Sequence, residues 1–258
     1  MLKSDRVRAA VAASSKHLLG SAVVALICSA LVFLLWYPYP YSELVGGKEL
    51  FLIVLAVDLV CGPLLTLIVF DPEKPRSELF RDIGMVIAMQ FAALGYGLYS
   101  VAEARPVFLG FEGNRFRVVT LPEIDISAMG EAEPGFRDFS LLGGPRLIGV
   151  RVAQGTDPDF RESVQLSLQG LHSSFRPSRW VEFDSQREQV LGEMKPVENL
   201  RKRYPAEVLQ IDEAVQASGL DDGKIGFLPL VAKTNSSWVV LVSAVDARPV
   251  GFLPLDGW

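Results

Sequence analysis

The chain has 258 residues, of which 50% are hydrophobic and 21% are charged, and its mean hydropathy is +0.29. The apolar excess lies before residue 105, which excludes a plain soluble globular protein. The net charge of −5 argues against nucleic-acid binding, which usually needs a basic surface. Two Cys and two His are too few to build a metal site by themselves. These features indicate a membrane protein with a large water-exposed part, and we expect no cofactor and no small-molecule substrate.

Three apolar stretches, 18–36, 50–70 and 83–102, each have about 20 residues, the length that crosses a bilayer as a helix. The second is interrupted only by Asp58, and the most polar side chain of the third is Gln90. The first stretch ends in aromatic residues and prolines (36–41), which suit a membrane surface and stop a helix. We interpret it as an uncleaved anchor and predict a three-helix membrane domain over residues 1–104.

Basic residues predict how the helices are oriented. Four Lys or Arg precede the first stretch and three lie in the loop 71–82, whereas the loop between the first two stretches has only Lys48. Excess Lys and Arg stay on the cytoplasmic side of a membrane. We therefore expect a cytoplasmic N-terminus, a lipid bilayer around the helices and an extracytoplasmic domain over residues 105–258.

The second domain mixes strand and helix patterns. Short β-rich runs are predicted to be strands at 106–111, 115–120, 147–152, 225–232, 238–244 and 250–255. Helical apolar spacing predicts helices at 160–171, 185–194 and 206–217. Residues 121–145 are rich in Glu, Gly and Pro, and we expect a long mobile loop there. The predicted fold class is a membrane protein with a three-transmembrane-helix bundle followed by an α+β extracytoplasmic domain.

Asp58 is the most informative single residue of the membrane domain. A carboxylate near the bilayer centre is costly, so it usually faces a polar partner or a cavity. Ser29 and Gln90 lie at depths that permit a polar contact with it. Asp58 either holds the bundle together or binds a partner's transmembrane helix, and an ion path lacks the necessary relay of polar groups. Gly62-Pro63, one turn further on, predicts either a packing kink or a notch that faces a partner.

Small residues recur at four-residue spacing in the third apolar stretch, at Gly84, Ala88 and Ala92. Small residues at this spacing allow helices to approach closely. The pattern therefore predicts either internal packing of the three helices or a seam for a foreign helix.

Motifs for catalysis are missing from the sequence. There is no Gly-x-Ser-x-Gly elbow, no phosphate-binding loop and no dinucleotide fingerprint. His172 beside Ser173 and Ser174 is better explained as a surface or helix-end residue, and His17 is expected at the inner membrane edge. We predict that the protein is not an enzyme.

Several segments resemble the type IV pilin accessory proteins of the TfpX/TfpZ family. They are Trp36-Tyr37-Pro38, the run 58–70, Ala104-Arg105-Pro106-Val107 with the residues 111–116, and the last eight residues, 251–258. The resemblance covers mainly residues 15–120. It implies an inner-membrane protein of Gram-negative bacteria that assists pilin stability, export or pilus assembly, and it does not imply an enzyme. In such a bacterium the extracytoplasmic domain is expected to be periplasmic.

These observations lead to a functional hypothesis. The helices would shield the apolar N-terminal helix of a type IV major pilin, with Asp58, Gly62, Pro63 and Gln90 as partner-binding residues. The outer domain would contact the pilin head, in a chaperone-like and transient way. The alternative is a membrane-anchored periplasmic sensor or signalling adaptor, whose cytoplasmic segments would be short. A membrane-tethered hydrolase is disfavoured because no nucleophile and base are evident.

Overall fold

The computed structural model describes the chain from residue 3 to residue 258. The chain divides into two compact units. The helical unit contains Met1–Ser42 and Gly46–Arg105, and the sheet unit contains Glu43–Val45 and Pro106–Trp258. The predicted fold class, long apolar helices followed by a mixed α and β part, is confirmed.

Within the described residues, three helices are long and apolar enough to cross a membrane. They are α1 (Lys3–Leu31, continued by a π-helical turn, Val32–Trp36), α3 (Gly47–Val69) and α4 (Arg76–Glu103). A short helix, α2 (Tyr41–Leu44), follows the first. All three long helices begin before the predicted apolar runs, because the polar residues at their starts also adopt helical conformation. Pro38 and Pro72 follow the ends of the first and second helices, where a missing N–H costs nothing.

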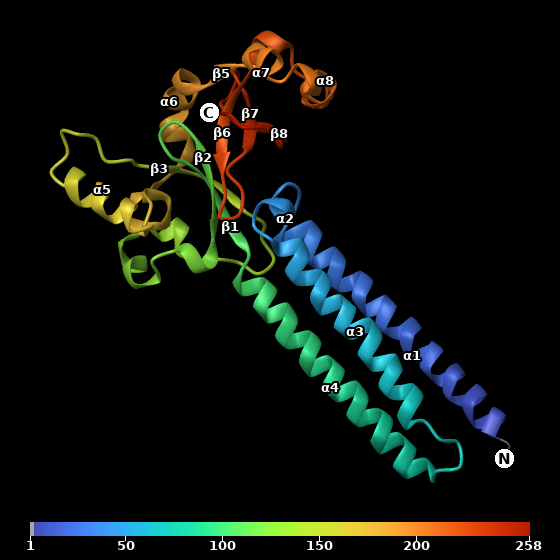
Figure 1. Cartoon of the computed structure of the whole chain (residues 1–258). Helices are drawn as coiled ribbons and strands as arrows, with labels where there is room; N and C mark the ends of the chain where they lie inside the picture. The colour runs from blue at the N-terminus through green and yellow to red at the C-terminus, as the bar shows by residue number, and fades with distance from the viewer. Residues whose placement is uncertain (1–2) are drawn as a thin grey trace. The chain divides into compact units, whose positions relative to one another are not determined.

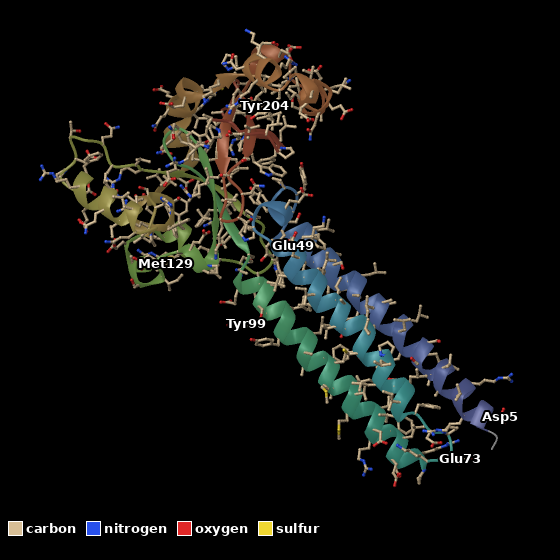
Figure 2. The ribbon with its side chains drawn as sticks, viewed as in Figure 1. Asp5, Glu49, Glu73, Tyr99, Met129 and Tyr204 are labelled. Atoms are coloured by element: carbon tan, nitrogen blue, oxygen red, sulfur yellow. The ribbon has the colours of Figure 1, made fainter. Side chains whose placement is uncertain are left out.

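The central member of the helical unit is α3, which packs against both α1 and α4 (Figure 1). Most apolar side chains of the three helices are exposed and point outward, as Figure 2 shows for Tyr99 on α4. Apolar surface of this extent is not left to water in soluble monomers. The helical unit therefore presents a surface suited to lipid.

The sheet unit contains one mixed sheet, which has eight strands in the described chain. The strands are β1 (Pro106–Phe111), β2 (Phe116–Thr120), β3 (Arg146–Val150), β4 (Trp180–Val181), β5 (Lys195–Pro196), β6 (Ile225–Val231), β7 (Trp238–Ser243) and β8 (Pro249–Leu253). Their order is β4-β3-β1-β2-β6-β7-β8, and β5 also pairs with β6. The predicted strands are confirmed, and they pair as a β1–β2 hairpin and a β6–β7–β8 meander. The sheet is completed by two parallel pairings, β1 with β3 and β2 with β6.

Four helices accompany the sheet: α5 (Phe160–Leu168), α6 (Arg187–Glu193), α7 (Glu198–Arg203) and α8 (Val208–Ala217). Three of them were predicted, and α7 was not. Ile211 and Val215 of α8 are buried in one apolar cluster with Phe227, Leu241 and Leu253 of the meander. This cluster fixes the C-terminal half of the sheet unit.

The expectation of a long mobile loop over residues 121–145 is wrong for its first part. Residues 121–136 form short 3₁₀ turns, and Ile124, Ala132 and Phe136 are buried. They share an apolar cluster with Phe108 and Trp180. The scattered apolar residues among Glu, Gly and Pro anchor this segment to the sheet.

Candidate functional site

Gln90 of α4 connects all three long helices through its side chain. Its Nε2 donates hydrogen bonds to Ser21 Oγ of α1 (2.9 Å) and to the backbone oxygen of Asp58 in α3 (3.0 Å). Its Oε1 lies 2.8 Å from Nε2 of His17 in α1. Each hydrogen-bonding position of this amide except one acceptor lone pair is therefore used between helices.

His17 contacts both neighbouring helices through its two ring nitrogens. Gln90 Oε1 carries no proton, so His17 Nε2–H is the donor in that contact. On the other side of the ring, Thr66 Oγ1 of α3 lies 2.5 Å from Nδ1 and shares a hydrogen bond with it. Ser14 Oγ adds a bond to the backbone oxygen of Pro63 (2.7 Å). A continuous polar network thus runs from α3 through α1 to α4.

Asp58 is buried, with only 6% of the residue exposed. Its Oδ1 has no hydrogen-bond partner among residues 3–258. The predicted polar contact with Ser29 is wrong, because Ser29 Oγ donates to Ala25 of its own helix (2.7 Å). Gln90 does reach Asp58, but at the backbone. The carboxyl group is therefore buried in an apolar setting with an acceptor left over, which costs free energy unless a donor is supplied.

Gly62 and Pro63 are both buried on α3. A Cβ atom at Gly62 would lie 2.1 Å from Gln90 Oε1, so only glycine lets the Gln90 side chain approach α3 this closely. Pro63 leaves the carbonyl of Leu59 without its helical donor. The predicted notch at Gly62-Pro63 is occupied by Gln90.

Two grooves run along the helical unit. One, of about 460 Å³, is lined by all three long helices and includes His17, Ser21, Asp58 and Gln90. The other, of about 410 Å³, lies between α3 and α4 and also includes Asp58 and Gln90. The remaining lining residues are mostly apolar. Such grooves can hold an apolar helix that brings a polar group to the level of Asp58.

The small-residue stripe Gly84, Ala88 and Ala92 is exposed, and a Cβ atom at Gly84 would meet nothing within 4 Å. Its interpretation as internal packing is therefore wrong. The close approach between α3 and α4 occurs instead at Gly97, where a Cβ atom would lie 2.6 Å from Val54 Cγ1.

The sheet unit has its own buried charged cluster, centred on Glu112 at the end of β1. Glu112 Oε2 accepts from Arg117 Nε at 2.9 Å and from Arg115 Nε at 3.3 Å, and Oε1 accepts from the backbone and hydroxyl of Ser174 at 3.3 Å. Burial alone would raise the pKa of Glu112, but the Arg117 charge and hydrogen bond hold it below its ordinary value. The Glu112 carboxylate is therefore ionised, and its negative charge is balanced by Arg117 and Arg115.

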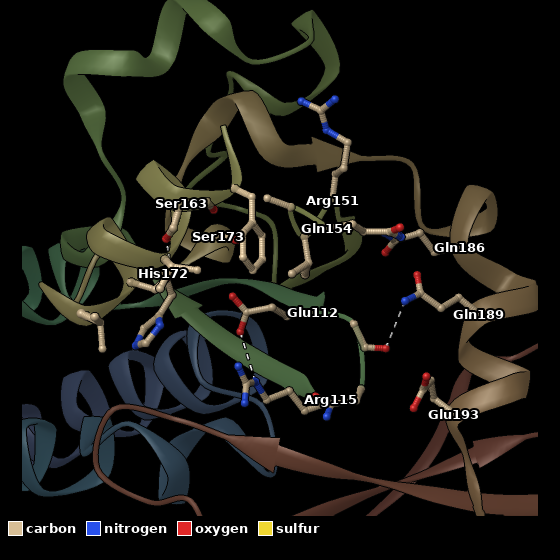
Figure 3. A pocket seen from close by; sticks show the side chains of 18 residues that line it. Glu112, Arg115, Arg151, Gln154, Ser163, His172, Ser173, Gln186, Gln189 and Glu193 are labelled. Carbon is tan, nitrogen blue, oxygen red and sulfur yellow. Dashed lines mark hydrogen bonds and ion pairs between the residues drawn. The ribbon is translucent and has the colours of Figure 1, made fainter. Parts of the chain in front are cut away.

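Beside this cluster lies a cavity of about 720 Å³ (Figure 3). It is lined by Glu112, α5, α6 and His172. Burial, followed by the nearby Arg117 charge, lowers the pKa of His172, so its ring is neutral at physiological pH. His172 precedes a 3₁₀ turn, as its predicted helix-end position requires, but it also lines this cavity. Among the residues described, no group of three or more His, Cys, Asp or Glu could hold a metal ion.

Sequence reasoning missed the three α1 and α3 residues that complete the network: His17, Ser21 and Thr66. A signal was present, because Ser14, His17 and Ser21 recur at helical spacing and form a polar stripe on one face of α1. The apolar run begins at residue 18, so Ser14 and His17 fall outside it and only Ser21 falls within it.

Comparison with known proteins places the chain in a family. A family model described as fimbrial assembly protein FimB matches residues 5–46. Two fimbrial assembly proteins of Dichelobacter nodosus, from serogroups E1 and I, are 33% and 32% identical to the chain over 242 residues, which cover 93% of the chain and 93% of each relative. A third, from serogroups C1 and C2, is 34% identical over 131 residues, 51% of the chain and 100% of that relative. No solved structure matches the chain. With this level of identity over nearly its whole length, the chain belongs to the FimB family of fimbrial assembly proteins.

Proposed function

We propose that this protein is a non-catalytic accessory protein of the bacterial inner membrane that shields the apolar N-terminal helix of a type IV major pilin. Membership of the fimbrial assembly family supports a role in fimbrial biogenesis. The resemblance of residues 15–120 to the TfpX/TfpZ proteins supports pilin as the partner. By binding pilin transiently, the protein would assist its stability, its export or its assembly.

The observation that carries this proposal is buried Asp58, which lines a mostly apolar groove and whose Oδ1 has no hydrogen-bond partner among residues 3–258. Placing an ionised carboxylate at the centre of a bilayer costs about 3 kcal/mol on insertion scales. A helix that fills the groove and donates a hydrogen bond to Asp58 would offset part of that cost. Gly62, Pro63 and Gln90 would act by shaping the groove, because Gln90 lies against Gly62 and joins the helices on either side.

The proposed orientation has a cytoplasmic N-terminus and a periplasmic sheet unit. Its support is the distribution of basic residues, which are concentrated in the N-terminal half of α1 and, over residues 74–81, around the start of α4. The ion pairs of Arg6 with Asp71 (3.2 Å) and of Lys74 with Asp82 (2.8 Å) lie at this end of the helices. In this orientation the groove is available to a membrane-inserted pilin before assembly.

Photo-crosslinking in cells that assemble type IV pili with this chain tests the proposal. A benzoylphenylalanine in place of Phe91, which is exposed and lines the groove, should give adducts with the major pilin. The Gly20→Phe substitution should reduce these adducts and pilus number. Gly20 lines the groove, and a Cβ atom there meets nothing within 4 Å, so the new ring fills the groove without disturbing the helices.

Leu19→Phe is the matched control. It places the same ring on the neighbouring residue of α1, which is 69% exposed and lines neither groove. Absence of pilin adducts from position 91, or equal adducts in the Gly20→Phe and Leu19→Phe variants, would refute shielding by this groove.

A further inference from the structure

The cavity of the sheet unit has features of a binding site that the membrane groove does not explain. We propose that it binds the carboxyl-terminal segment of a protein partner, with the terminal carboxylate at Ser163 and Ser173 and apolar side chains along α5. Its volume of about 720 Å³ lies in the usual range of ligand pockets, about 300–1,000 Å³, and suits a few residues.

The first observation is a buried cation behind the cavity wall. Arg176 is only 9% exposed, and within the described chain it forms no ion pair. One guanidinium nitrogen, Nη2, donates to Ser163 Oγ and, at 3.1 Å, to Ser173 Oγ, whereas its buried Nε has no partner among those residues. Asp159, Glu162 and Glu112 act on Arg176 only from beyond ion-pair distance. An anion held closer, by hydrogen bonds to the two serines, would therefore be stabilised by this buried charge.

The two serines lie between Arg176 and the cavity and are polarised by its positive charge. A guanidinium group has only donors, so each serine oxygen accepts from Arg176 and keeps its own proton to donate. Neither proton has an acceptor within residues 3–258, and both serines line the cavity (Figure 3). Two hydroxyl donors polarised by one cation form a site for a carboxylate.

The second observation is an apolar stripe on α5. Phe160, Val164 and Leu168 recur every four residues, are 36%, 43% and 84% exposed, and all line the cavity. A helix of a soluble unit usually buries such a stripe. This wall therefore fits the apolar side chains of the occupant.

Side-chain amides favour a peptide over a fatty acid. Asn114 and Gln154 line the cavity, and their amide groups have no hydrogen-bond partner in the described chain. Gln189 adds a third amide, held only by a 3.5 Å contact with the backbone oxygen of Gly113. These groups both donate and accept, which suits the amides of a peptide main chain. A fatty acid would leave them unpaired.

The acidic lining residues do not oppose a carboxylate at the serines. Glu112 is balanced by Arg117 and Arg115. Figure 3 places Glu193 on the α6 wall, across the cavity from Ser163. The anion site and the acidic wall are thus separate parts of one cavity.

Peptide binding to the full-length protein in lipid nanodiscs tests the assignment without any pilin, so its outcome is independent of the proposed function. The probe is a fluorescein-labelled peptide, Gly-Ser-Leu-Val-Leu, with either a free carboxylate or a carboxyl-terminal amide, measured by fluorescence anisotropy against empty nanodiscs. We expect the free acid to bind at least tenfold more tightly than the amide. The paired substitution Ser163→Ala with Ser173→Ala should abolish that preference.

Leu168→Asp should weaken binding of the acid at least tenfold, because it places a charge on the apolar wall of the cavity. Leu168 is highly exposed, so this replacement leaves the fold intact. Leu209→Asp, on an equally exposed leucine of α8 outside the cavity, is the control and should change nothing. Equal binding of acid and amide, or unchanged binding by Leu168→Asp, overturns the proposal. Octanoate that binds as tightly as the peptide overturns the peptide assignment in favour of a fatty acid.

Discussion

Replacing Gln90 by methionine should loosen the helical unit, because it removes every interhelical hydrogen bond of this side chain while keeping its length. Three bonds are lost, to Ser21, to the Asp58 backbone and to His17. Hydrogen bonds between membrane helices are worth about 0.6 kcal/mol each on average. We therefore expect the free energy of unfolding of the helical unit to fall by roughly 2 kcal/mol.

Cys28 provides an assay that reports on the helical unit alone. Cys28 is buried, with 8% of the residue exposed, whereas the other cysteine, Cys61, is exposed and can be replaced by serine. In detergent micelles titrated with sodium dodecyl sulfate, the rate of maleimide labelling at Cys28 should rise when the helices separate. The midpoint should shift to lower dodecyl sulfate in Gln90→Met.

The matched control is Ser29→Ala, which removes a hydroxyl bonded only within its own helix. A double-mutant cycle of Gln90→Met with Ser21→Ala should give a coupling energy of about 0.6 kcal/mol. If Gln90→Met changes stability no more than Ser29→Ala does, the network does not hold the helices together and the argument is wrong.

Three further predictions concern packing and charge. Burial alone would raise the pKa of Glu112, but Arg117 keeps it below the ordinary value of 4.5. The ionised Glu112 carboxylate therefore stabilises the fold at neutral pH, and this stabilisation is lost as the pH falls below 4.5 and the carboxylate is protonated. Glu112→Gln should cost about 3 kcal/mol at pH 7 and flatten the acid dependence, measured by urea unfolding at several pH values. Gly97→Leu should shift the dodecyl sulfate midpoint strongly and Gly84→Leu should not, because only the first new side chain meets a neighbouring helix. Trp180→Ala should lower the stability of the sheet unit by about 3–5 kcal/mol in the same urea experiment, and a smaller loss would show that its apolar cluster can collapse around the gap.

The sequence predicted the parts of the fold whose cause is local. Apolar runs of membrane-spanning length and the turn at Gly113, whose φ is +75°, are both readable from neighbouring residues. The arrangement of the sheet could not be predicted in this way. The pairing of β2 with β6 joins segments that are remote in sequence, and no local pattern specifies it.

The candidate site shows the same division. Asp58 and Gln90 stand out because they are polar in apolar stretches, and the structure brings Gln90 to the Asp58 backbone. His17 precedes the apolar run of α1, so apolar patterning does not point to it, and no local pattern marks Ser21 as a neighbour of Gln90. The carboxyl oxygen left without a donor is a result of side-chain geometry, which residue spacing cannot supply.

The parallel pairing of β2 with β6 has a consequence for the order in which the protein can fold. Phe116 leaves the ribosome early, but its partner Leu230 is synthesised close to the end of the chain. Until then the β1–β2 hairpin carries an open edge, which invites pairing with other chains. A chain interrupted before β6 would keep that edge for its whole lifetime. Translation must therefore be nearly complete before β6 can cover the open edge of β2.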